Sequence, residues 1–210
     1  SPQLGPYPES LPGGTPPEGI AAEVWIHGLA AHHLASLEGR TQSALLTIID
    51  YSLPSTERRL WVVNTGTNEV LETEYVAHGS GSGGLFATHF SNRRNTHQSS
   101  LGTFVTGTTF HGVRGLSLRL RGLERGINDR AWERGIVIHG TPNVSSSRAL
   151  QGSMGRTEGC PAVATIAARR LIRRIENGVV VFVWYPDRAF LARSDYLDRA
   201  RAALRLSSTD

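Results

Sequence analysis

Residues 135–140 read GIVIHG, and 21 positions after His139 the stretch GRTEGCP, residues 155–161, carries Cys160, the one cysteine of the chain. The apolar run before the histidine is typical of a buried strand, and Gly140-Thr141-Pro142 turns that strand into a loop. His139 therefore ends a buried strand where a loop begins, a usual position for an active-site base. The alternative for an isolated histidine is a structural hydrogen bond at the strand end.

Cys160 follows a glycine and immediately precedes Pro161. Proline is tolerated in the first turn of a helix, and apolar residues recur every fourth position after it: Val163, Ala167, Leu171 and Ile175. We therefore expect a helix over residues 161–176, with the cysteine at its start. The unpaired N–H groups and the dipole of a helix start favour a negative charge, so the pattern predicts a stabilised thiolate.

The same turn offers hydrogen-bond donors for a tetrahedral intermediate. We expect the backbone N–H groups of Glu158, Gly159 and Cys160 to form an oxyanion hole, a contribution of roughly 3–4 kcal/mol in measured cases. A lone cysteine is commonly just a small buried apolar residue. Its pairing with His139 favours catalysis, with the thiol as nucleophile and the imidazole as its general base.

The rest of the chain is predicted to be mainly β, in an α+β arrangement. Apolar and β-branched runs separated by turn signals predict strands over residues 44–50, 60–64, 70–77, 102–106, 116–120, 135–139 and 179–184. Helical spacing of apolar residues predicts a packing helix over residues 21–37, which Gly39 is well placed to end.

Composition predicts one catalytic domain over residues 20–190. Six prolines and several glycines crowd residues 1–19, which we expect to be a leader or linker, and residues 191–210 are expected to form a C-terminal helix or tail. No stretch approaches the roughly 18 consecutive apolar residues of a membrane span, and the first residues lack the pattern of a signal peptide.

Charge and histidine content narrow the function classes. The formal net charge of +4 is carried by arginines spread over many segments, so no concentrated patch indicates a nucleic-acid partner. One cysteine excludes an intramolecular disulfide. Eight histidines could suggest zinc, but the sequence has no HExxH motif, no His-x-His pair and no cysteine pair. We expect neither a metal nor a cofactor.

His139-Gly140 followed by Gly159-Cys160 resembles the His-Gly … Ser/Thr-x-Gly-Cys signature of murein L,D-transpeptidases, the YkuD-like catalytic domain. Residues 60–79 resemble the opening strand pair of that domain, and residues 100–104 resemble its Pro-x-Gly-x-Phe segment. Pro161 is typical of the sub-branch with Gly-Cys-Pro at the nucleophile. The resemblance covers residues 44–186. It implies an L,D-transpeptidase-like β-sandwich with an N-terminal packing helix and a helix starting at the catalytic cysteine.

The resemblance implies a transferase that acts in cell wall biogenesis. Cys160 would form a thioester with a peptidoglycan tetrapeptide stem and release D-alanine, and an amine of another stem would then take the acyl group. His139 would move the protons, with the carbonyl of Gly140 orienting its ring. Water as acceptor would make the enzyme an L,D-carboxypeptidase. The resemblance further implies a carbapenem adduct on the cysteine, and the substrate implies a periplasmic or extracellular location.

Candidate substrate-binding residues are Arg156, Thr157, His111 and His78. Arg156 could replace an arginine that many members carry just after the nucleophile, or it could be a solvated loop charge. The two histidines end or follow strand-like runs and could line a cleft. Glu158 stands where many members carry a second histidine. Its charge would raise the pKa of the thiol if it faced the sulfur, so we expect it to face solvent or to bind substrate.

Two alternative functions belong to other classes of protein than the L,D-transpeptidases. Papain-like thiol proteases carry a tryptophan just after the catalytic cysteine and place the histidine far downstream, whereas here Pro161 follows the cysteine and His139 precedes it. A non-catalytic cell-wall-binding domain would keep the fold without the chemistry, and loss of the base or the nucleophile would be expected in it. Both residues are present.

Overall fold

A computed structural model describes residues 15–206 of the chain. The predicted leader falls mainly on residues 1–14, which lie outside the described residues, as do residues 207–210. Within the described part, no helix is long and apolar enough to span a membrane.

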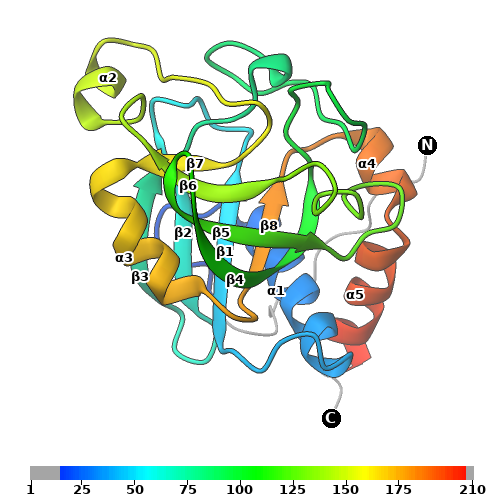
Figure 1. Cartoon of the computed structure of the whole chain (residues 1–210). Coiled ribbons are helices and arrows are strands. Elements are labelled where there is room, and N and C mark those ends of the chain that lie inside the picture. Colours follow the sequence, from blue (N-terminus) through cyan, green and yellow to red (C-terminus); the bar gives the residue numbers. More distant parts are fainter. Residues whose placement is uncertain (1–14, 207–210) are drawn as a thin grey trace.

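Eight strands form one mixed sheet in the order β3-β2-β1-β8-β4-β5-β6-β7 (Figure 1). The strands are β1 (Leu45–Asp50), β2 (Arg58–Asn64), β3 (Glu69–Tyr75), β4 (Gly102–Gly112), β5 (Gly115–Gly122), β6 (Val137–Thr141), β7 (Ala162–Ala164) and β8 (Val180–Trp184). Two neighbouring pairs are parallel, β1 with β8 and β6 with β7, and the other pairs are antiparallel. The central strand β8 is buried along its whole length, as its unbroken run of valines and aromatic residues requires.

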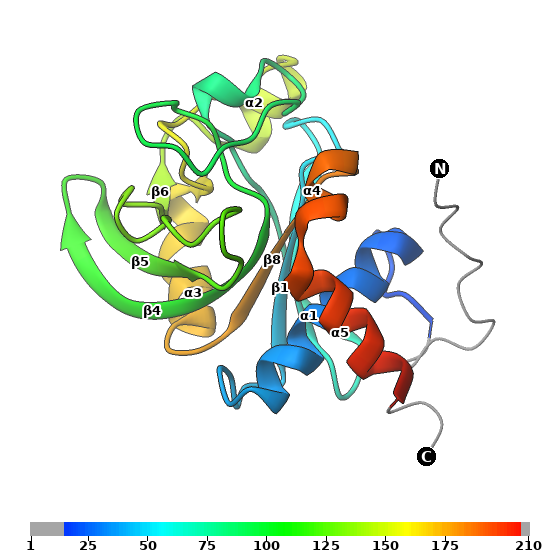
Figure 2. The same ribbon diagram turned by 90° about the vertical axis from the view of Figure 1, so that its right-hand side faces the viewer.

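The helices cover the sheet from two sides. They are α1 (Ala22–Leu37), the short 3-10 turn η1 (Ser80–Ser82), α2 (Ser146–Leu150), α3 (Thr165–Ile175), α4 (Arg188–Arg193) and α5 (Asp195–Leu206). Helix α1 packs against β1 and β8 and lies side by side with α5, and β4 and β5 curl away on the other side (Figure 2). Because α5 buries Tyr196, Leu197 and Ala200, the C-terminal segment contributes a helix to the core.

The two ends of the sheet meet. The N–H of Ala77, just beyond β3, donates a 2.8 Å hydrogen bond to the carbonyl oxygen of Ala162 in β7. The sheet therefore curls until its first and last strands are neighbours, and the helix that follows β7 is brought beside β3. This closure holds the segment that contains Cys160 against the opposite end of the sheet.

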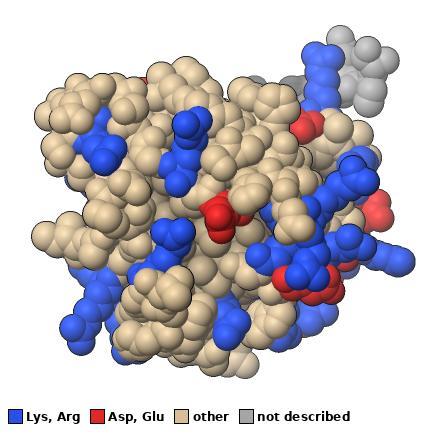
Figure 3. All heavy atoms as spheres, turned by 45° about the horizontal axis from the view of Figure 1, so that its top comes forward, with Lys and Arg blue, Asp and Glu red and all other residues tan. Residues whose placement is uncertain are grey.

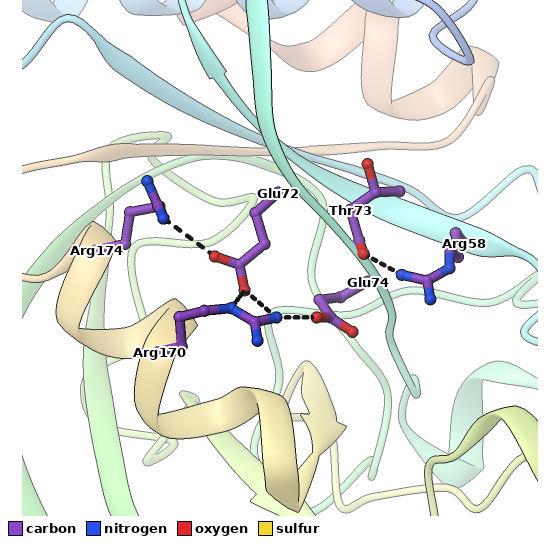
Figure 4. A network of polar contacts seen from close by, with 6 residues as sticks. All are labelled: Arg58, Glu72, Thr73, Glu74, Arg170 and Arg174. Carbon is purple, nitrogen blue, oxygen red and sulfur yellow. Dashed lines mark hydrogen bonds and ion pairs between the residues drawn. The ribbon is translucent and has the colours of Figure 1, made fainter.

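An ion-pair network fixes α3 to β3 (Figure 4). Arg170 Nη2 lies 2.6 Å from Glu74 Oε1 and 3.0 Å from Glu72 Oε1, and Arg174 Nε lies 3.1 Å from Glu72 Oε2. The two glutamate side chains are nearly buried, at 4% and 11% exposed. Burial raises the pKa of Glu74, and the arginine charge opposes that rise. Carboxylates buried in this way need their cationic partners.

The predicted mainly β, α+β fold is confirmed, and each of the seven predicted strands corresponds to a strand of the sheet. The helix predicted to start at the cysteine was misplaced, since α3 begins at Thr165. Residues 162–164 pair instead with β6 as the parallel strand β7, because the ladder with residues 139–141 satisfies their backbone hydrogen bonds. Cys160 therefore precedes a strand, and the stabilisation of its thiolate by a helix start was a wrong prediction. The division into a leader, a domain over residues 20–190 and a C-terminal segment stays a prediction.

Candidate active site

Cys160 and His139 lie beside the same edge of the sheet. In the parallel ladder of β6 and β7, His139 pairs with Ala162. Cys160 comes two residues before Ala162, just before β7 begins. The thiol and the imidazole both lie close enough to Arg114 for its charge to lower the pKa of each. The sulfur lies at the beginning of β6, with Sγ 3.7 Å from the carbonyl oxygen of Gly135.

The imidazole of His139 is buried and held in one orientation. Its Nδ1 lies 2.9 Å from the carbonyl oxygen of Gly140. Since a carbonyl accepts only, Nδ1 carries the proton and Nε2 keeps its lone pair. Burial lowers the pKa of His139, the bond to Gly140 opposes this, and the charge of Arg114 lowers it further. The ring is therefore neutral at pH 7 and able to accept a proton through Nε2.

Gly140 cannot be replaced by a larger residue without moving α3. A Cβ at this position would lie 2.9 Å from the Cβ of Ala168 and 3.1 Å from the Cα of Thr165. The glycine lets the helix approach the strand next to the histidine, and its carbonyl remains in place to accept from the ring.

The Cys160 thiol is protonated in this environment. Burial raises its pKa, and the negative charge of Glu158 adds to the rise. A hydrogen bond with the Val137 backbone and the charges of Arg114 and Arg134 act in the opposite direction. On the face of the molecule drawn in Figure 3, acidic atoms lie near the middle with arginine side chains around them. Because the thiol is neutral at rest, a base must remove its proton for it to act as a nucleophile.

Residues 157–160 form a short turn that positions Cys160. The hydroxyl of Thr157 donates a 2.7 Å hydrogen bond to the carbonyl oxygen of Cys160 and accepts one of 3.1 Å from the N–H of Gly159. Gly159 has φ +119°, a backbone conformation that favours glycine. The prediction that the Gly159 N–H serves an oxyanion hole is therefore wrong, because that donor is already bound. Among residues 15–206, no acceptor faces the N–H groups of Glu158 and Cys160.

Ser99, in the segment before β4, and residues 79–80 at the start of η1 support the turn. Ser99 Oγ donates to the carbonyl oxygen of Gly159 over 3.1 Å and accepts from the N–H of Gly79 over 3.0 Å. The contact is so close that a Cβ at Gly79 would lie 2.9 Å from the Cα of Gly159. The N–H of Ser80 also donates to the carbonyl oxygen of Thr157 over 2.7 Å. The nucleophile turn is thus fixed by hydrogen bonds from both sides.

Arg134 is a residue of this region that the sequence reasoning missed. Its Nη1 donates to Ser100 Oγ and to the carbonyl oxygen of Ser91, each over 2.5 Å, and its Nη2 donates to the carbonyl oxygen of Gln98 over 2.6 Å. The same guanidinium lowers the pKa of Cys160. Arg134 therefore ties the loop over residues 91–100 to the region of the nucleophile. The sequence feature that could have pointed to Arg134 is its position directly before the GIVIHG stretch.

His78 does not reach the surface. The imidazole is fully buried, its Nδ1 accepts a 2.8 Å hydrogen bond from Arg59, and its Nε2 lies 3.4 Å from the carbonyl oxygen of Gly83. Burial, together with the charge of Arg59, lowers the pKa of His78 to about 4. The predicted contact of His78 with substrate is therefore wrong, since both ring nitrogens face protein groups.

The other predicted binding residues lie around the turn. Thr157 shapes the turn itself, Arg156 is exposed and donates to the carbonyl oxygen of Gly83 over 3.3 Å, and Glu158 is exposed. His111 is exposed near the tip of the β4–β5 hairpin, which also carries Arg114. Contacts of these side chains with a substrate stay a prediction. Among the described residues, no group of three acidic, histidine or cysteine side chains could hold a metal ion.

A family model described as the L,D-transpeptidase catalytic domain matches residues 18–184. The chain belongs to this family. No curated protein sequence matches the chain.

Several solved L,D-transpeptidases are similar to this chain at low identity. LdtMt1 in complex with imipenem is 15% identical over 67% of this chain and 59% of its own, with a TM-score of 0.42. The helical cell shape determining protein Pgp2 from Campylobacter jejuni is 15% identical over 90% of this chain and 64% of its own, with a TM-score of 0.48. The L,D-transpeptidase from Xylanimonas cellulosilytica is 16% identical over 77% and 78%, with a TM-score of 0.42. The chain thus spans less than two thirds of the first two structures.

Proposed function

We propose that the chain is a peptidoglycan L,D-transpeptidase with Cys160 as its nucleophile and His139 as its general base. The observation that carries the proposal is the hydrogen bond of His139 Nδ1 to the Gly140 carbonyl. It leaves Nε2 as the acceptor, in the same region as a thiol that needs a base. The membership of the L,D-transpeptidase catalytic domain family supplies the substrate class.

The reaction proceeds in two acyl transfers. His139 Nε2 takes the proton of the Cys160 thiol as Sγ attacks the amide carbonyl between the third residue of the stem, typically diaminopimelate, and the terminal D-alanine. When the tetrahedral intermediate collapses, the C–N bond breaks and the imidazolium protonates the leaving amine, which departs as D-alanine. The enzyme then holds the stem as a thioester. An amine of a second stem attacks this thioester and gives a proton to His139. The C–S bond then breaks, and the imidazolium protonates the departing Cys160 thiolate.

The backbone N–H groups of Glu158 and Cys160 are the proposed donors to the oxygen of the tetrahedral intermediate. Gly159 is left out because its N–H binds Thr157. Two donors placed beside the nucleophile would stabilise the developing negative charge.

The uncharged thiol of Cys160 and the uncharged imidazole of His139 determine how activity depends on pH. Burial lowers the pKa of His139 and raises that of Cys160, so both groups are uncharged over a window around neutrality. Protonation of the imidazole in acid removes the base. Activity is therefore expected to fall as the pH drops through the lowered pKa of His139.

Two alternatives share parts of this site. An L,D-carboxypeptidase would use the same residues with water as the acceptor, and a wall-binding domain would keep the fold without turnover. The proposed substrate implies a periplasmic or extracellular location. A carbapenem adduct on Cys160 is part of the proposal, since LdtMt1 was solved in complex with imipenem.

The test uses purified protein and diaminopimelate-containing tetrapeptide fragments, with products measured by mass spectrometry. We expect free D-alanine and cross-linked dimers, and we expect Cys160→Ala to abolish both. Thr67→Ala, an exposed change in the β2–β3 turn, is the matched control and should leave both products unchanged. D-Alanine without dimers would assign the carboxypeptidase. Absence of both products from the folded protein would contradict the proposal and favour a binding domain.

A further inference from the structure

A groove lies on the outer side of β4, outside the turn that carries Cys160. Its volume is about 390 Å³, and its walls include Thr108, Arg121, Trp132 and Asn177. A register shift in the pairing with β5 between Thr106 and Thr109 opens the sheet at this point. At this irregularity the backbone of Thr106 and Gly107 pairs with residues 177–179, which brings Asn177 to the groove.

Trp132 stands out among the four tryptophans of the chain. Its side chain is 48% exposed, whereas Trp25, Trp61 and Trp184 are between 0% and 4% exposed. A large exposed aromatic side chain beside a groove indicates a surface that is covered by a ligand.

Arginines surround the indole ring. The guanidinium of Arg119 lies 4.3 Å from the ring centroid of Phe110 and 4.8 Å from that of Trp132, so it is held between two aromatic rings. The guanidinium of Arg121 lies 5.7 Å from the ring centroid of Trp132. Among residues 15–206, neither Arg119 nor Arg121 forms an ion pair, and no acidic residue lines the groove. Arg121 therefore lines the groove as a positive charge without a carboxylate partner in the described part of the chain, and Arg119 lies against the same indole. Arg40 also lines the groove, 3.9 Å from Glu38.

The groove shares a strand with the candidate active site. Within β5, Arg119 pairs with Val137 of β6, and Ser117 pairs with His139. Paired residues of antiparallel strands put their side chains on the same face of a sheet. Arg119 therefore lies on the face that carries the imidazole, two residues further along β5.

We propose that this groove binds an anionic carbohydrate polymer. The exposed face of Trp132 packs on a sugar ring or on the C–H groups of a polyol, Asn177 and Thr108 offer hydrogen bonds to hydroxyls, and Arg121 binds the negative group. The shared chemistry is a sugar or polyol chain that carries a carboxylate or a phosphate at each repeat. This site goes beyond the proposed acyl transfer, because binding there needs no turnover.

The experiment measures binding to the Cys160→Ala protein, so that turnover plays no part. Oligogalacturonate supplies the carboxylate arm, a glycerol phosphate polymer supplies the phosphate arm, and a neutral chitin oligomer of similar length is the uncharged control. Isothermal titration calorimetry gives the affinity of every variant, and the fluorescence of Trp132 reports occupancy where that tryptophan is present. We expect at least one anionic polymer to bind, to protect the indole from iodide quenching, and to bind more weakly as salt rises.

Variants separate this groove from general charge attraction. Trp132→Ala and Arg121→Gln should each weaken binding by about ten-fold, whereas Trp132→Phe should keep most of it because a phenyl ring still stacks. Arg169→Gln removes the same charge from an exposed position on α3 and should leave the affinity unchanged. Equal losses in Arg169→Gln and Arg121→Gln would overturn the proposal. So would binding of neither anionic polymer, equal binding of the chitin oligomer, or tighter binding of a single-stranded oligonucleotide.

Discussion

Thr157 holds the carbonyl oxygen of Cys160 through a 2.7 Å hydrogen bond from its hydroxyl. The hydroxyl oxygen of Thr157 also accepts a hydrogen bond from the N–H of Gly159, so one side chain closes the turn. The sequence predicted that Thr157 contacts substrate. In the structure its hydroxyl holds the turn that orients Cys160.

Replacement of Thr157 by valine should lower kcat with little change in KM. Valine keeps the shape of the side chain but loses the hydroxyl, so the Gly159 N–H and the Cys160 carbonyl lose their partner. A loss of about ten-fold to a hundred-fold in kcat is expected, since small displacements of a nucleophile are costly. Thr157→Ser, which restores the hydroxyl, should recover most of the activity. Steady-state kinetics of the three proteins on one donor peptide decide the matter, and equal activity of the valine variant would refute this role.

Replacement of Arg134 by glutamine should raise the pKa of the Cys160 thiol. The guanidinium favours the thiolate, and its removal leaves only the Val137 backbone and Arg114 to oppose burial and Glu158. The rate of alkylation by iodoacetamide as a function of pH reports the thiol pKa directly, and the curve should move toward higher pH. Arg130→Gln, an exposed change four residues earlier, is the matched control. If the two variants gave the same curve, Arg134 would act only in holding the loop over residues 91–100.

Replacement of Glu158 by glutamine should have the opposite effect. The glutamate charge raises the pKa of Cys160, so its removal should lower that pKa and increase the thiolate fraction at neutral pH. Alkylation at pH 7 should become about two-fold to five-fold faster, as expected for an exposed neighbouring charge. Glu69→Gln, at the exposed start of β3, should leave the rate unchanged. A slower reaction of the Glu158 variant would contradict the electrostatic role.

Stability should fall as the pH drops from about 6.5 toward 4. Burial lowers the pKa of His27 and of His78 from 6.5 to about 4 in the folded chain. The unfolded chain therefore binds these protons first, and each histidine contributes stability above pH 6.5 that is lost as the pH falls through this window. The melting temperature of the wild type should decrease there, and His78→Gln should flatten part of the decrease. A melting temperature that stays constant between pH 6.5 and 4 would count against neutral buried histidines.

The pairing of β6 and β7 explains what the sequence could and could not predict. Runs of apolar and β-branched residues marked seven strands because each is recognisable from its own residues. Ala162–Ala164 becomes a strand only by pairing with residues 139–141, and its apolar residues also fit the helical spacing of the segment that follows. The spacing alone therefore placed the helix start too early.

Some residues of the candidate site could be predicted from the sequence, and others could not. His139 and Cys160 could be found because residue type, position and neighbouring glycines coincide in one pattern. Arg134 and Ser99 act through partners that are distant in the chain, such as Gln98 and Gly159, and no local pattern announces such contacts. His78 was misread because its burial and its hydrogen bond with Arg59 of β2 arise only when the chain folds.

The most direct test of the central claim is intact-mass and peptide mass spectrometry of the protein incubated with a tetrapeptide donor and no acceptor. The account predicts a covalent adduct equal to the donor minus D-alanine, located on the peptide that contains Cys160 and removed by hydroxylamine as a thioester would be. The adduct should form much more slowly in His139→Gln. Release of D-alanine by the Cys160→Ala protein, or an adduct on any other residue, would contradict the assignment of Cys160 as the nucleophile.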